Sequence, residues 1–293
     1  MFASLPAILR AIIYMVVGMF FFMLGDLFLK LASQHLPLGL VVFFLGAGMS
    51  LLFAVMMIGQ GAPLFHKAYW HHAMIMRCVG ESIGVIGVMI AVAFAPLSTV
   101  SAIMQSLPLL LTLIGAVFLN ETVGKHRIFA LLAGLIGVLI IIRPGFEGFD
   151  FFASFTLVGV LGMAIRDVGT RIMPQDISTG ALSFWGSVAI AVTGIAMLAV
   201  MQDAHLPNQT GMLFCVGLVI AAAIGTLCVS TAMRLAEVSA ISPFRYIRVV
   251  FGIGAGIFIL GESVDAPTYI GCVIVVSAGL YSWFRERRVA KHA

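Results

Sequence analysis

Two arginines stand in the middle of an apolar stretch that is long enough to cross a membrane. The stretch covers residues 237–262, and a helix there would place Arg245 and Arg248 roughly 12 and 16 Å along it, at about 1.5 Å per residue. That is near the middle of a hydrocarbon core of about 30 Å, where charge costs most. Because a guanidinium matches a carboxylate or phosphate with a rigid fork of donors, the pair predicts a site for an anionic or carboxylate-bearing molecule. Neutralisation by carboxylates on neighbouring helices is the alternative.

Three more charged residues lie inside apolar stretches, namely Arg77, Glu81 and Arg166. Four arginines then face one glutamate, which leaves an excess of positive charge within the membrane. Glu81 follows Arg77 by one helical turn, and Asp167 is on the same segment as Arg166, so these carboxylates can meet part of the excess. We expect at least one arginine to remain for a substrate.

Neutral side chains complete the predicted site. Gln105 and Tyr246 could donate hydrogen bonds and Trp185 could form an aromatic wall, although ordinary helix packing explains all three equally well. Glu81 carries a second hypothesis, because a partly buried carboxylate can bind a proton and couple its movement to transport. The simpler interpretation is that Glu81 neutralises Arg77.

The composition excludes a soluble protein. Hydrophobic residues make up 62% of the 293 residues and charged residues only 10%, and the mean hydropathy is +1.15. These values indicate an all-α membrane protein. The four cysteines lie in apolar stretches and are expected to be small buried hydrophobes, and His66, His71 and His72 lack a paired carboxylate, so no metal or other cofactor is expected. The positive charge gathers in the last nine residues, which indicates a juxtamembrane tail and no nucleic-acid partner.

Apolar stretches separated by polar breaks predict ten transmembrane helices. Pro108 and Pro243 are expected to interrupt the fourth and the ninth, since proline removes a backbone donor. The ten predicted spans are residues 8–29, 37–59, 72–94, 97–119, 127–142, 153–173, 178–201, 211–233, 238–260 and 267–284.

Basic residues in the connections predict the orientation. With the N-terminus in the cytoplasm, ten lysines and arginines fall on the inner side, while only Lys30 and Arg143 fall on the outer side. We therefore expect a multi-pass protein of the cell (inner) membrane with both termini cytoplasmic.

The two halves of the chain are related by a repeat with an offset of 141 residues. Gly18 recurs as Gly159, Gly84 as Gly225, Asp26 with Lys30 as Asp167 with Arg171, Ser98 as Ser239 and Glu121 as Glu262. Five spans in each half form two inverted repeats, an architecture suited to exposing one central site to each face in turn. The shared charges are expected to be structural. The charges inside spans have no charged counterpart: Arg77 corresponds to Leu218, Glu81 to Ala222, Arg166 to Gly25, Arg245 to Met104 and Arg248 to Leu107.

In each half, a short polar corner follows the fourth span. The corner consists of Asn120, Glu121 and Thr122 in the first half and of Gly261, Glu262 and Ser263 in the second. A glycine-rich segment, residues 131–137, follows the first corner. With ten spans in two five-span halves, the chain resembles the EamA type of the drug/metabolite transporter superfamily. The resemblance implies a central cavity lined by the first, third and fourth spans of each half. It assigns no role to Arg245 or Arg248.

The sequence therefore predicts a secondary transporter, not an enzyme, that moves a small polar metabolite, anionic or carboxylate-bearing, by alternating access. A proton-coupled exporter of cationic or hydrophobic compounds that uses Glu81, and a non-transporting membrane scaffold, are the alternatives. The expected partners are the small-molecule substrate, membrane lipid and, for the first alternative, a coupling proton. The expected domains are two EamA-like five-helix repeats at residues 1–142 and 153–284, the second inverted, and a basic cytoplasmic tail at 285–293.

Overall fold

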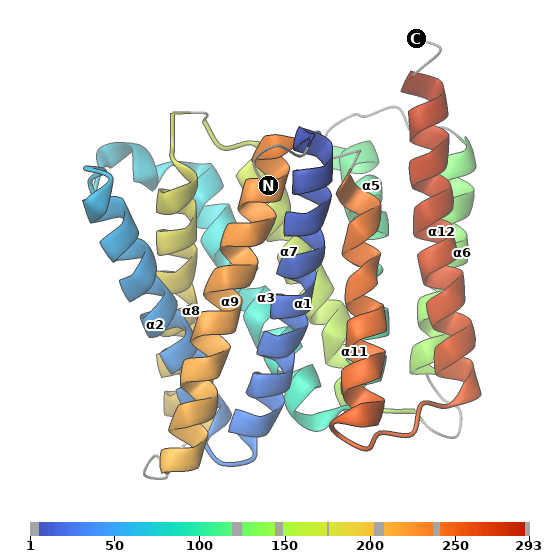
Figure 1. Ribbon diagram of the computed structural model, residues 1–293, viewed down its shortest axis with the longest axis horizontal. Helices are drawn as coiled ribbons and strands as arrows, with labels where there is room; N and C mark the ends of the chain where they lie inside the picture. The colour runs from blue at the N-terminus through green and yellow to red at the C-terminus, as the bar shows by residue number, and fades with distance from the viewer. Residues whose placement is uncertain are drawn as a thin grey trace. The chain divides into compact units, whose positions relative to one another are not determined.

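The computed structural model describes residues 6–118, 125–143, 149–174, 176–201, 208–236 and 241–290, and it contains helices and no strand within them. Figure 1 shows the helices, drawn from blue at the N-terminus to red at the C-terminus. They are α1 (Ala7–Ser33), α2 (Leu38–Gly59), η2 (Lys67–Trp70), α3 (His72–Phe94), α4 (Leu97–Met104), α5 (Leu107–Phe118), α6 (Lys125–Ile142), α7 (Phe151–Arg171), α8 (Thr179–Met201), α9 (Gln209–Leu235), η3 (Ser242–Tyr246), α11 (Ile247–Phe258) and α12 (Ala266–Ala290).

Every apolar stretch that we expected to form a span is helical over most of its described residues. Within the described ranges, six helices are long and apolar enough to cross a membrane, namely α1, α2, α3, α7, α8 and α9. Shorter apolar helical segments cover Leu97–Leu111, Ile128–Ile142 and Ala266–Tyr281. The prediction of an all-helical membrane protein is thus confirmed.

One detail differs from the sequence-based expectation. Helix α12 continues to Ala290, so residues 285–290 extend the last helix where we expected a separate tail. No glycine or proline interrupts the chain there, and helix propagation needs no new nucleus. The corner residues Asn120, Glu121 and Thr122 lie outside the described residues, as do Gln175, Glu237 and Ser239.

The helices are grouped into two compact units. Unit 1 comprises Met1–Met23, Ala95–Ser154 and Ile224–Ala293, and unit 2 comprises Leu24–Phe94 and Phe155–Ala223. Each unit therefore takes helices from both sequence halves.

In unit 2, the antiparallel helices α2 and α8 lie side by side (Figure 1) and contact each other through glycines. A Cβ atom on Gly39 would lie 2.7 Å from the backbone nitrogen of Leu198, and one on Gly180 would lie 3.2 Å from the side chain of Met57. Small residues of this kind let the backbones of membrane helices approach closely.

Helices α3 and α7 pack in the same way within unit 2. A Cβ on Gly162 would overlap the backbone of Gly84, and a Cβ on Gly159 would lie 2.9 Å from the backbone nitrogen of Val88. The two backbones are in direct contact, which brings polar side chains near the end of α7 beside those of α3.

In unit 1, α6 packs against α12 and α4 packs against α11. A Cβ on Gly137 would lie 2.8 Å from the side chain of Val275, and one on Gly256 would lie 3.4 Å from the Cβ of Ser98. The small residues Gly252, Ala255 and Gly256 are buried on α11.

Several close contacts occur in pairs related by the repeat. Adding 141 to one residue number of a contact and subtracting 141 from the other gives the second contact of the pair. A Cβ on Gly18 would lie 3.3 Å from the carbonyl oxygen of Gly225, and a Cβ on Gly159 would lie 3.4 Å from that of Gly84. In the same way, the contact of Gly39 with Leu198 corresponds to that of Gly180 with Met57, and the contact of Gly137 with Val275 corresponds to that of Gly134 with Ala278.

Two helices of unit 1 are interrupted at corresponding positions. Helix α4 ends at Met104, and the N–H groups of Gln105 and Ser106 donate to carbonyls only three residues back, at 3.2 and 3.0 Å. In the second half, the 3₁₀ helix η3 contains Pro243 and ends at Tyr246, where α11 begins. Gln105 and Tyr246 are equivalent in the repeat. The interruptions that we predicted near Pro108 and Pro243 are therefore present.

Candidate functional site

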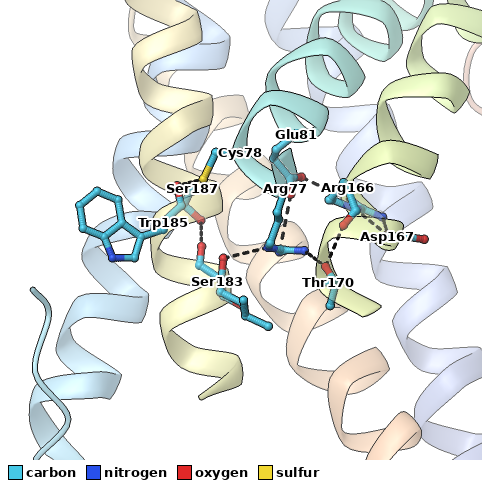
Figure 2. A network of polar contacts seen from close by, with 10 residues as sticks. Arg77, Cys78, Glu81, Arg166, Asp167, Thr170, Ser183, Trp185 and Ser187 are labelled. Atoms are coloured by element: carbon cyan, nitrogen blue, oxygen red, sulfur yellow. Dashed lines mark hydrogen bonds and ion pairs between the residues drawn. The ribbon is translucent and has the colours of Figure 1, made fainter. Parts of the chain in front are cut away.

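A network of charged side chains joins α3, α7 and α8 within unit 2 (Figure 2). Arg77 extends from α3 and donates from Nε to the carbonyl oxygen of Leu182 at 3.2 Å and from Nη1 to the hydroxyl of Thr170 at 2.6 Å. Its Nη2 lies 3.6 Å from Oε2 of Glu81, one turn further along α3. Arg77 thus contacts three helices.

Arg166 on α7 completes the network. It donates from Nε to Oδ1 of Asp167 at 2.9 Å, and its Nη1 lies 3.4 Å from Oε1 of Glu81. The side chains of Arg77, Glu81, Arg166 and Asp167 are only 13 to 24% exposed. Two arginines and two carboxylates therefore neutralise each other in a largely buried position.

Glycines make room for this network. A Cβ on Gly80 would overlap the backbone nitrogen of Arg166, and a Cβ on Gly169 would lie 2.9 Å from that of Arg77. On α8, a Cβ on Gly186 would lie 3.3 Å from Oε2 of Glu81. Larger side chains would separate the helices and lengthen the ion pairs.

Three of the four charged residues of the network have apolar counterparts in the repeat, while the fourth, Asp167, corresponds to Asp26. In the repeat, Gly25 is equivalent to Arg166, Leu218 to Arg77 and Ala222 to Glu81. A Cβ on Gly25 would lie 3.7 Å from the side chain of Leu218 and 4.0 Å from the backbone nitrogen of Ala222. At these three positions the helix contact is therefore ionic in one place and apolar in the other.

The remaining predicted site residues lie elsewhere. Arg245, Tyr246, Arg248 and Gln105 belong to unit 1, whereas Arg77, Glu81, Arg166 and Trp185 belong to unit 2. Figure 2 shows the indole of Trp185 pointing away from the charged network, and its ring centroid lies 5.6 Å from that of Phe65 and 6.0 Å from that of Trp70.

In unit 1, the predicted site residues lie at the two helix interruptions. Tyr246 is 6% exposed and its phenol packs against Gly279 on α12, while Gln105 is 5% exposed and donates to the carbonyl of Ser101 at 3.3 Å. Arg245 and Arg248 are half-buried. The guanidinium carbon of Arg248 lies 5.6 Å from the centroid of the Phe22 ring, a cation–π geometry.

Sequence reasoning missed two members of the charged network, Thr170 and the carbonyl of Leu182. Thr170 follows Arg166 by one turn and so shares its helix face, a spacing that the sequence does contain. A backbone carbonyl leaves no signal in the sequence. Among the described residues, no group of three His, Cys, Asp or Glu side chains is placed to hold a metal ion.

Comparisons with known proteins point to one family. The model of the EamA-like transporter family matches residues 9–143 and again residues 151–283. A pseudopaline exporter, CntI, of Pseudomonas aeruginosa is 26% identical over 267 residues, which are 90% of this chain and 92% of that protein. An S-adenosylmethionine uptake transporter of Rickettsia bellii is 24% identical over 196 residues, 67% of each chain. A riboflavin transporter of Vibrio cholerae is 25% identical over 203 residues, 64% of this chain and 65% of that one.

A solved crystal structure with 16% sequence identity covers 92% of this chain and 97% of its own, with a TM-score of 0.63, so the two folds are alike. The matched family and the named relatives are transporters. They confirm the expectation of a multi-pass transporter rather than an enzyme.

Proposed function

Since this chain belongs to the EamA-like transporter family, we propose that it is a secondary transporter of the cell (inner) membrane that moves a small polar metabolite, anionic or carboxylate-bearing, by alternating access. Both termini lie in the cytoplasm in this proposal. The ten helical segments form two five-span repeats of opposite orientation.

Two observations support the inverted repeat. The family model matches the chain twice, once in each half. The glycine contacts also occur in pairs related by the same offset, as for Gly18 with Gly225 and Gly159 with Gly84. Such a repeat lets one half of the molecule move relative to the other around a fixed site.

The observation that carries the proposal is the pair of helix interruptions at Gln105 and Tyr246. Interrupted spans at corresponding positions of two inverted halves are the best structural indication of a substrate site in secondary transporters. Arg245 and Arg248 flank the second interruption, and the first has Met104 and Leu107 instead. Both arginines also interact with other groups of the protein, so a bound anion would add to or replace those interactions.

The charge distribution supports an anionic substrate at Arg245 and Arg248. Arg77 and Arg166 form ion pairs with Glu81 and Asp167, so their positive charges are neutralised within the protein. The relatives are named for chemically different compounds, so their names alone do not select a substrate class.

The contacts of Glu81 favour a structural role over proton coupling. Each of its oxygens faces a guanidinium, at 3.6 Å from Arg77 and 3.4 Å from Arg166. A proton on Glu81 would remove the counter-charge of two buried cations at once. The exporter alternative therefore has less support than transport of an anion.

The test combines binding and transport. A ligand that binds only the folded protein raises its melting temperature, so a panel of organic acids, amino acids and organic cations identifies the class. Counterflow in proteoliposomes then measures transport of the best ligand. R245Q and R248Q should fold normally and lose transport of an acid at least about tenfold, a change of about 1.4 kcal/mol. Lysine at either position should restore transport only in part, because it keeps the charge but loses the fork of donors.

The matched control is R143Q, an arginine at the end of α6. It should leave transport unchanged. Wild-type transport in both R245Q and R248Q, or a melting shift with organic cations only, would contradict the proposed anion site.

A further inference from the structure

A cavity of about 430 Å³ lies in unit 2 between α3 and α8, on a face separate from the charged network. Its walls are formed by apolar side chains of the two helices, and its end is formed by Tyr69 and Trp70 of η2 together with Trp185. Ile75, Val79 and Val192 line it and are 50 to 60% exposed. Because α3 and α8 are apolar enough to span a membrane, these exposed side chains border lipid rather than water.

The cavity is elongated along the helices. On α3 its lining residues run from Ile75 to Ile86, a distance of about 17 Å at about 1.5 Å per residue. One leaflet contributes about half of a hydrocarbon core of about 30 Å, or roughly 15 Å. The groove therefore has the length of one leaflet, and it starts at the membrane surface marked by Tyr69 and Trp70.

The walls offer little to a polar ligand. The hydroxyl oxygens of Ser82 and Thr193 are 2.8 Å apart, and Cys78 donates from Sγ to the carbonyl oxygen of Trp185 at 3.6 Å. One donor at the η2 end is different: the indole Nε1 of Trp185 is buried and has no hydrogen-bond partner among the described residues. A buried donor without a partner costs free energy, and a hydrogen-bond acceptor at the head of an otherwise apolar ligand would remove that cost.

The η2 end is also basic. Lys67 is exposed, as is His66, whose Nδ1 accepts the N–H of Ala68 at 3.3 Å. His71 accepts the N–H of Ala73 through Nδ1 at 3.2 Å. With Nδ1 occupied as an acceptor, each neutral imidazole carries its proton on Nε2 and presents a donor. A cation and imidazole donors suit the phosphate of an anionic headgroup.

We propose that this groove binds one anionic glycerophospholipid, with an acyl chain along α3 and α8 and the phosphate near Lys67 and His66. The ester region then lies near Trp185. This site is distinct from the proposed substrate site, and it does not depend on the transport function.

The experiment uses quenching of tryptophan fluorescence by lipids with brominated acyl chains. W283F leaves Trp70 and Trp185 as the reporters. The protein is placed in phosphatidylcholine vesicles that contain brominated phosphatidylglycerol or, at the same bromine content, brominated phosphatidylcholine. Phosphatidylglycerol should bind roughly fivefold more tightly than phosphatidylcholine, which is the effect expected of one basic residue at the membrane surface. K67Q should abolish that preference.

A189F fills the groove and should reduce quenching by brominated phosphatidylglycerol. V216F is the matched control, since Val216 is 53% exposed on α9 and does not line the groove, and it should leave quenching unchanged. Equal quenching by both lipids in wild type and in K67Q, which alters only an exposed side chain, would overturn the proposal. Loss of a dimer in A189F with unchanged quenching would assign the groove to a second copy of the chain instead.

Discussion

The carboxylate of Glu262 accepts two hydrogen bonds from Ser98: its Oε2 accepts the backbone N–H at 3.0 Å and the side-chain hydroxyl at 2.9 Å. Its Oε1 accepts the N–H of Leu97 at 2.7 Å. These are the first two residues of α4, whose N-terminal N–H groups have no partner within the helix. A corner residue from the second half of the sequence thus caps a helix from the first half. This is a structural role, as we expected for the charges that the two halves share.

The first prediction follows from this cap. Glu262→Gln keeps the shape but leaves one acceptor oxygen, and its amide NH₂ would face an N–H donor. Because hydrogen bonds to a charged group contribute about 1.5–3 kcal/mol, the free energy of unfolding should fall by about 2 kcal/mol. Melting in detergent measures the change. Ser98→Ala removes only the hydroxyl and should cost less; an equal loss in both variants would show that the backbone bonds contribute little.

The second prediction concerns the charged network. Glu81→Gln removes the carboxylate shared by Arg77 and Arg166 and should destabilise the protein by about 3 kcal/mol, because buried cations lose their counter-charge. The repeat supplies a compensated variant: Arg77→Leu with Glu81→Ala copies the residues at Leu218 and Ala222. This double variant should recover most of the lost stability, as a double-mutant cycle measures. A stable Glu81→Gln variant that has lost transport would place Glu81 in the transport mechanism instead.

The third prediction concerns Asp265, which precedes α12 and forms an ion pair with Arg143 at the end of α6. Partial burial acts to raise the pKa of Asp265, but hydrogen bonds from Thr268 and then from Arg143 outweigh it, so the pKa lies below its ordinary value. A carboxyl group whose pKa is lowered on folding stabilises the protein above its unfolded pKa of about 3.9, and this contribution is lost as the pH falls through the lower folded pKa.

Asp265→Asn should therefore lower the melting temperature at pH 7 and make it less sensitive to acid below about pH 4. Melting curves between neutral and acidic pH measure both effects. An acid dependence identical to that of the wild type would show that Asp265 makes no contribution to it.

The fourth prediction tests the topology. In a background without the four native cysteines, Gln60→Cys and Asn208→Cys place single thiols in the connections after α2 and before α9. An impermeant maleimide applied to intact cells should label position 208 and not position 60, since the basic residues predict a cytoplasmic connection at 60. Labelling of both positions from the same side would contradict the inverted repeat.

Local sequence patterns predicted much of the fold. The length of the apolar stretches predicted the helices, and the prolines predicted the interruptions of the fourth and ninth spans. The pairing of Arg77 with Glu81 was also predictable, because residues four apart share a helix face. The side chain of Asp167 does meet Arg166, its neighbour on the same segment.

Long-range contacts were not predictable in this way. The contact between Glu81 and Arg166 joins residues 85 positions apart, and it depends on the close glycine packing of α3 and α7. No spacing rule within one helix contains that information. The same holds for the cap of α4 by Glu262 and for the separation of Arg77 and Arg245 into different units.

The balance of charge in the unit 2 network has an electrical consequence. Moving one elementary charge across a membrane potential requires about 2.3 kcal/mol per 100 mV. Arg77 and Arg166 with Glu81 and Asp167 have a net charge of zero, so the potential does almost no work on them if they move together. Any voltage dependence of transport must then arise from other charges, such as the arginines of unit 1 or a charged substrate. The network can hold three helices together at every potential that the cell maintains.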